Sequence, residues 1–121
     1  MDQVKQSDIS KQILPGEQIY EVFGPDAYIP DHDAYMAYCK TTCVTDGLSN
    51  HCHTGNSVLY ILQAKDTVVR YGKSQDAIDQ KQAVQAGTVL HIEKGEWYRF
   101  EFSSRNGSAE YIIFSALSTE T

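Results

Sequence analysis

Residues 47–64, GLSNHCHTGNSVLYILQA, carry the two patterns that decide the fold and the candidate site. The near-continuous apolar run at 58–62 is typical of a β-strand that is buried on both faces. Just before it, His51 and His53 are two residues apart, so on an extended chain their side chains point to the same face. The stretch therefore predicts a buried strand that follows two imidazoles able to converge on one metal ion or one substrate.

Outward from this stretch, the chain contains further short segments with β-strand character. They are rich in aromatic and β-branched residues and have no helical period. The expected strands are residues 18–23, 35–45, 67–71, 89–92, 97–102 and 111–117. Asp46-Gly47 closes the second of these, Asn106-Gly107 predicts a tight hairpin turn between the last two, and residues 76–80 suggest a helical turn in a loop. Many short strands without a long helix predict a sandwich or barrel.

The length and charge of the chain narrow its organisation and partners. With 121 residues and no internal repeat or linker, it is expected to hold an N-terminal arm at 1–17 and a single domain at 18–121. The net charge of −6, with ten scattered basic residues, argues against nucleic acid as a partner. There is no apolar signal segment and no run long enough to cross a bilayer, so we expect a cytoplasmic protein without a membrane partner.

The three cysteines, Cys39, Cys43 and Cys52, are expected to be free thiols. Cys39 and Cys43 are four residues apart on one predicted strand, which separates their Cα atoms by roughly 13 Å, whereas a disulfide tolerates about 7 Å. Cys52 lies between the two histidines and should face away from them as a small buried hydrophobe.

The opening stretch resembles the first sequence motif of the cupin superfamily. In that family a Gly precedes His-x-His, a Glu follows within four residues, and the next strand ends in a Gly. Here Gly47 precedes His51-Cys52-His53, while Ser57 stands at the Glu position and Ala64 at the second Gly position. The strand between them resembles the corresponding strand of the family.

Residues 87–102, GTVLHIEKGEWYRFEF, resemble the second cupin motif, in which a Gly is followed by Pro-x-Gly, a His and an Asn. Both glycines are kept as Gly87 and Gly95, whereas the Pro, His and Asn positions hold Glu93, Tyr98 and Phe102. The resemblance covers residues 36–103 in one frame. It implies an all-β, cupin-like β-barrel or jelly roll of antiparallel strands with little helix, and a site inside the barrel.

The resemblance also implies the residues of that site. Of the four ligand positions in metal-binding cupins, His51 and His53 are kept and the other two hold Ser57 and Tyr98. We therefore expect a divalent metal ion (Fe, Zn, Ni or Mn) held by His51, His53 and Tyr98, with Tyr98 also acting in catalysis. By period two, the residues that share this inner face and are expected to bind the substrate are Ser57, Leu59, Ile61, Phe100 and Phe102.

Three functions stay open at this point, and the sequence does not decide whether the protein is an enzyme. The first is a metal-assisted enzyme with oxygenase, lyase or isomerase chemistry on a small oxygenated substrate. The second is a metal-free isomerase with a His base and a Tyr acid, and the third is a module that binds a small molecule without chemistry. A homodimer is expected, because small cupins often pair and edge strands need covering.

Overall fold

The structure is a computed structural model that describes residues 1–44 and 50–117. In these residues the regular structure is β-strand except for one three-residue 3-10 turn, η1 (Gln6–Asp8). None of the described residues forms a helix long and apolar enough to cross a membrane. The strands are β1 (Gln12–Leu14), β2 (Glu17–Gly24), β3 (Ile29–Pro30), β4 (Ala34–Thr42), β5 (His51–Cys52), β6 (Ser57–Lys65), β7 (Thr67–Gly72), β8 (Gln80–Ala83), β9 (Val89–Ile92), β10 (Trp97–Phe102) and β11 (Ser108–Ala116).

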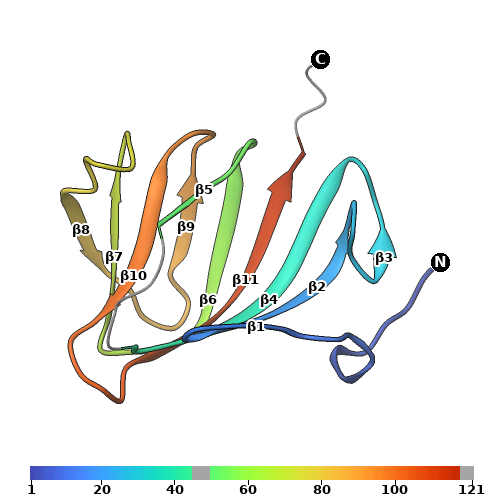
Figure 1. The fold of residues 1–121 in the computed structure, drawn as a ribbon, viewed down its shortest axis with the longest axis horizontal. Helices are drawn as coiled ribbons and strands as arrows, with labels where there is room; N and C mark the ends of the chain where they lie inside the picture. Colours follow the sequence, from blue (N-terminus) through green and yellow to red (C-terminus); the bar gives the residue numbers. More distant parts are fainter. Residues whose placement is uncertain (45–49, 118–121) are drawn as a thin grey trace.

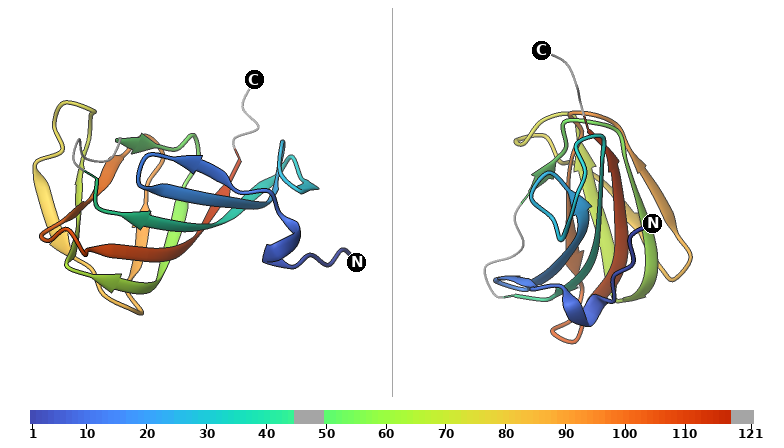
Figure 2. Two further views of the ribbon diagram at one scale, coloured as in Figure 1. Left: turned by 60° about the horizontal axis from the view of Figure 1, so that its bottom comes forward. Right: turned by 90° about the vertical axis from the view of Figure 1, so that its right-hand side faces the viewer.

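The strands form two sheets that pack face to face (Figures 1 and 2). Sheet A has seven strands in the order β1-β2-β4-β11-β6-β9, with β3 beside β2, and sheet B has the order β5-β10-β7-β8. Every pairing is antiparallel except that of β2 with β3. The expectation of an all-β, mainly antiparallel fold with little helix is confirmed.

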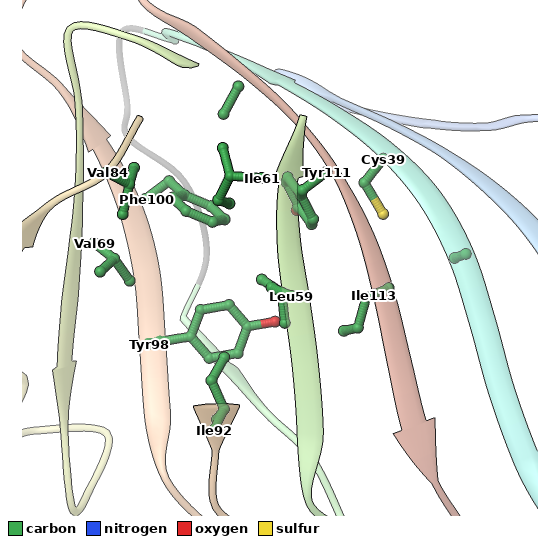
Figure 3. Packing of buried hydrophobic residues seen from close by; sticks show 12 residues of the cluster. Cys39, Leu59, Ile61, Val69, Val84, Ile92, Tyr98, Phe100, Tyr111 and Ile113 are labelled. Carbon is green, nitrogen blue, oxygen red and sulfur yellow. The ribbon is translucent and has the colours of Figure 1, made fainter. Parts of the chain in front are cut away.

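The core lies between the inner faces of the two sheets. Burial alternates along β6 and β11, as expected for strands that present one face to the interior and the other to solvent. Leu59 and Ile61 on β6 are fully buried, and Figure 3 shows the ring of Tyr98 extending from β10 toward Leu59. The buried cluster consists of Ala37, Cys39, Leu59, Ile61, Val69, Val84, Ile92, Tyr98, Phe100, Ala109, Tyr111 and Ile113.

The predicted hairpin at Asn106-Gly107 is wrong. β10 belongs to sheet B and β11 to sheet A, so the chain between them crosses from one sheet to the other instead of pairing two neighbouring strands. Neither Asn106 nor Gly107 has a positive φ. Gly107 is buried because the chain passes close to Phe102, where a Cβ atom would lie 2.6 Å from the Cβ of Phe102. Glycine at position 107 therefore allows the backbone to pass close to Phe102, and it is not part of a tight hairpin turn.

Three further differences concern β1, β8 and Cys52. Residues 12–14 lie within the predicted N-terminal arm of residues 1–17, and they form β1, which pairs with β2 and extends sheet A. Residue 80, the last of the predicted helical turn at 76–80, begins the edge strand β8, whose QKQA sequence is exposed throughout. Among the cysteines, Cys39 is buried, but Cys52 is exposed rather than buried. The turn predicted at Asp46-Gly47 lies outside the described residues.

Candidate active site

The structure brings together the two histidines and the tyrosine that the sequence singles out. In the pairing of β5 with β10, His51 lies directly opposite Tyr98, so their side chains share the inner face of sheet B. The ring centroids of His51 and Tyr98 are 5.8 Å apart, and those of His53 and Tyr98 are 5.6 Å apart. The three rings thus form one cluster on the inner wall of the barrel.

A carboxylate from the opposite sheet completes this cluster. Glu17 is the first residue of β2 and lies opposite Thr41 on β4, with its side chain toward the interior. Its Oε1 atom is 3.2 Å from Nε2 of His51, and the residue is only 9% exposed. A buried carboxylate needs partners because removing it from water is costly. The contact with His51 supplies one partner and links the two sheets.

His53 has a different partner, the hydroxyl of Tyr98. Nε2 of His53 is 2.8 Å from Oη of Tyr98, and the two rings are stacked. Burial, followed by the neighbouring His51, lowers the pKa of His53, which is thereby neutral at neutral pH. Burial also raises the pKa of Tyr98, followed by the charges of Cys39, Glu17 and Cys52, so its hydroxyl keeps the proton.

The residues expected to bind substrate lie on the inner face, where most of them form the packed core. Ser57, Leu59 and Ile61 are nearly or fully buried, Phe100 is 4% exposed, and Phe102 packs against the same cluster while half-buried. Ser57 shares a hydrogen bond of 2.7 Å with Ser115. None of these residues borders the cavities described next, and their role in substrate binding stays a prediction.

Two cavities lie next to the ring cluster. One, of about 220 Å³, touches Tyr98 between β7, β9 and β10, and exposed His91 is also on its wall. The other, of about 260 Å³, touches His53 at the end of the barrel near Tyr35 and Ser115. Both are somewhat smaller than the roughly 300 Å³ at which pockets for drug-sized molecules begin. The site is therefore sized for a small ligand.

The cupin resemblance implies a metal ion held by His51, His53 and Tyr98, and in the structure the two imidazoles have other partners. Among residues 1–44 and 50–117, no three His, Cys, Asp or Glu side chains lie close enough together to hold a metal ion. Nε2 of His51 contacts Glu17 and Nε2 of His53 contacts Tyr98, so each of these nitrogens is engaged with a different partner. The metal held by His51, His53 and Tyr98 stays a prediction.

The lowered pKa of His53 predicts a pH dependence of stability. Below about pH 6.5, the ordinary histidine pKa, the unfolded chain takes up a proton that folded His53 resists, so the free energy of unfolding falls as the pH falls toward the folded pKa. We expect His53→Gln to flatten this slope in urea unfolding curves recorded from pH 7.5 to 5. His32→Gln, at an exposed loop position, is the control. Equal slopes for His53→Gln and the wild type would contradict the prediction.

Comparison with solved structures identifies the architecture. The polyketide cyclase RemF from Streptomyces resistomycificus matches with a TM-score of 0.71 at 14% identity, over 98% of this chain and 80% of that protein. A Thermotoga maritima protein described as a predicted oxalate decarboxylase matches with a TM-score of 0.71 at 19% identity, over 97% and 100%. The chain has a cupin fold.

A third cupin neighbour is the hydroxypropylphosphonic acid epoxidase from S. wedmorenis. It matches with a TM-score of 0.69 at 14% identity, over 95% of this chain and 59% of that protein. No family model and no curated protein matches the sequence. At these identities the likeness establishes the fold, and the chemistry has to be argued from the side chains of the site.

Glu17 is the site residue that sequence reasoning missed. It is the last residue of the predicted arm at 1–17, directly before the first predicted strand at 18–23. One signal could have found it. Glu17 and Glu21 are two residues to either side of Ile19, an apolar residue that packs against the core, and period two places all three on one face.

Proposed function

We propose that this protein is a small-molecule enzyme of the cupin fold that transfers a proton at a carbon atom next to a carbonyl group. One observation carries the proposal. The two inward imidazoles have different partners at Nε2, a carboxylate for His51 and a phenol for His53. Such a difference in environment assigns opposite acid–base roles to chemically identical groups. Fold neighbours that are named as a cyclase, an epoxidase and a decarboxylase support an enzymatic role.

In this proposal His51 is the base. An ionised carboxylate only accepts hydrogen bonds, so the contact with Glu17 fixes the proton of His51 on Nε2. The lone pair then resides on Nδ1, which is free to take a proton from the substrate. The carboxylate also stabilises the imidazolium that forms, because opposite charges attract strongly where water is largely excluded.

His53 is the hydrogen-bond donor to the substrate oxygen. The raised pKa of Tyr98 keeps its hydroxyl protonated. In this proposal that hydroxyl donates a hydrogen bond to Nε2 of His53, 2.8 Å away, which leaves the imidazole proton on Nδ1. Neutral His53 then offers its Nδ1–H to the carbonyl oxygen. Tyr98 acts through His53 and is a positioning residue. His53 borders the cavity of about 260 Å³, whereas His51 borders neither cavity, so its contact with the substrate is part of the proposal.

The step conserves atoms and charge. The C–H bond next to the carbonyl breaks and its proton moves to Nδ1 of His51. The electron pair forms a carbon–carbon double bond, and the carbonyl oxygen gains the negative charge that the Nδ1–H of His53 stabilises. Return of a proton to the same carbon or to a neighbouring one completes an exchange or an isomerisation.

A metal-assisted reaction is the second candidate function. One observation favours it. Another solved structure with the same fold, of a protein named HppE, is described as its Fe(II) form. His51, His53 and Tyr98 would supply two imidazoles and a phenol, donors that suit several transition metals. An ion bound at both Nε2 atoms would have to replace the hydrogen bonds to Glu17 and Tyr98, which is why proton transfer ranks first.

Exchange of carbon-bound hydrogen for deuterium tests the proposal without knowledge of the product. We expect purified protein in D₂O to exchange the protons next to the carbonyl of at least one small ketone or aldehyde in a panel followed by NMR. The activity should survive dialysis against EDTA and disappear in His51→Ala. Exchange that requires added Fe(II), Zn, Ni or Mn would favour the metal-assisted function. Binding without exchange would leave a ligand-binding module.

A further inference from the structure

The cavity beside His53 offers hydrogen bonds but little charge. Its wall combines hydroxyl groups and one imidazole with small apolar groups: Tyr35, His53, Thr54, Gly55, Ser115, Ala116 and Leu117. A Cβ atom at Gly55 would overlap the carbonyl oxygen of Ala116, so glycine lets the end of β11 pass at this point. The volume of about 260 Å³ suits a compact molecule with one or two polar groups.

The inner face of sheet A carries two carboxylates. Glu17 and Glu21 lie on the inner face of β2, opposite Thr41 and Ala37 on β4. Glu21 accepts a hydrogen bond from Nε2 of Gln12 at 3.0 Å. Burial, followed by hydrogen bonding to Glu21 and its negative charge, raises the pKa of Tyr35, which borders the cavity. Glu21 therefore acts electrostatically on the cavity wall.

The positive charges, in contrast, lie outside the barrel. Arg70 and Arg99 both pair with Glu101 on the outer face of sheet B. Lys40 pairs with Glu110 on the outer face of sheet A. The other Lys and Arg residues are exposed: Lys5, Lys11, Lys65, Lys73, Lys81, Lys94 and Arg105. In the described part of the chain, no Lys or Arg borders the cavity beside His53.

We propose that the cavity beside His53 selects small uncharged carbonyl compounds and rejects carboxylates and phosphates of the same size, with Glu21 as a specificity residue. The inference rests on the proposed function, because it names the substrate class of that site. An anion entering the cavity would lose its hydration beside Tyr35, which interacts with the carboxylate of Glu21, and no Lys or Arg of the described residues lies on the wall to compensate. A neutral carbonyl loses less hydration and gains the imidazole as donor.

Two probes of matched size test this selectivity. Cyclohexanone carries the carbonyl without charge, and cyclohexanecarboxylate carries a negative charge on the same ring. We expect amide chemical-shift titrations to give an affinity at least tenfold higher for the ketone, with shifts at Tyr35, Thr54 and Ser115. Glu21→Gln should reduce this ratio at least threefold by improving carboxylate binding. Glu110→Gln, which removes a carboxylate on the outer face, should leave the ratio unchanged.

The binding experiment tests the ligand selectivity of the cavity, and the deuterium-exchange experiment tests the proton-transfer function. Equal or tighter binding of the carboxylate, no localised shift with millimolar ketone, or an unchanged ratio in Glu21→Gln would overturn the inference. If deuterium exchange nevertheless occurs, with carboxylates as substrates, the proton-transfer function stands and only the substrate class is wrong. If the ketone binds selectively but does not exchange its hydrogen for deuterium, the selectivity of the cavity is supported and the proton-transfer function fails.

Discussion

Glu17→Gln is expected to slow deuterium exchange by about 100-fold, within the range of roughly 10² to 10⁴ that a positioned acid or base contributes. The neutral amide removes the charge that stabilises the His51 imidazolium. It also offers an NH₂ group that can donate to Nε2 of His51 and thereby place the imidazole proton on Nδ1. The variant should therefore lose the base while keeping nearly the same side-chain volume. Initial rates in D₂O measure the effect.

The control for this substitution is Glu110→Gln. Oε2 of Glu110 accepts a hydrogen bond from Oη of Tyr38 at 2.8 Å, and Glu110 also forms an ion pair with Lys40. Like Glu17, it is a carboxylate on a strand of sheet A that has side-chain partners. It lies on the outer face, however, and should leave the exchange rate unchanged. Glu17→Gln with the exchange rate of the wild type would show that His51 does not depend on this carboxylate, and the assignment of the base would be lost.

The local part of the fold was predictable because it depends on period-two burial. Residues 58–62, 97–102 and 111–117 alternate or run apolar. The first two ranges lie within β6 and β10, and the third lies within β11 apart from its last residue. Which sheet a strand joins is a different matter, since it depends on contacts between distant parts of the chain. The loop at Asn106-Gly107 shows this, because its sequence suits a tight turn whereas packing against Phe102 and the crossing between sheets decide its shape.

The same division applies to the site. His51, His53 and Tyr98 lie within motifs whose spacing could be aligned, so their grouping followed from the cupin frame. Glu17 is 34 residues from His51 in the chain and reaches it only because sheet A folds over sheet B. The resemblance places Ser57 at the position of the family Glu, whereas the carboxylate that contacts an imidazole is Glu17 on β2. A carboxylate supplied by a distant strand leaves no motif in the sequence around the histidines.

Tyr98→Phe is expected to slow exchange by about 100-fold, again within the range for acid–base groups. The ring keeps its packing against Phe100 and Ile92, but the hydroxyl that donates to Nε2 of His53 is gone. Without this donor His53 is free to adopt the other tautomer, which presents a lone pair instead of a proton to the carbonyl oxygen. The ¹⁵N shifts of the His53 ring should report this change alongside the rate.

Tyr111→Phe separates the effect of the hydroxyl on catalysis from its effect on stability. Tyr111 is also a buried tyrosine of the core, and its Oη accepts a hydrogen bond from Oγ1 of Thr41 at 3.3 Å. Either substitution leaves a buried polar partner unsatisfied, which costs about 1–3 kcal/mol of stability. Similar losses of stability, with slow exchange and a changed His53 tautomer only in Tyr98→Phe, would support the proposed role. Equal rates in both variants would reduce Tyr98 to a core tyrosine that happens to contact a histidine.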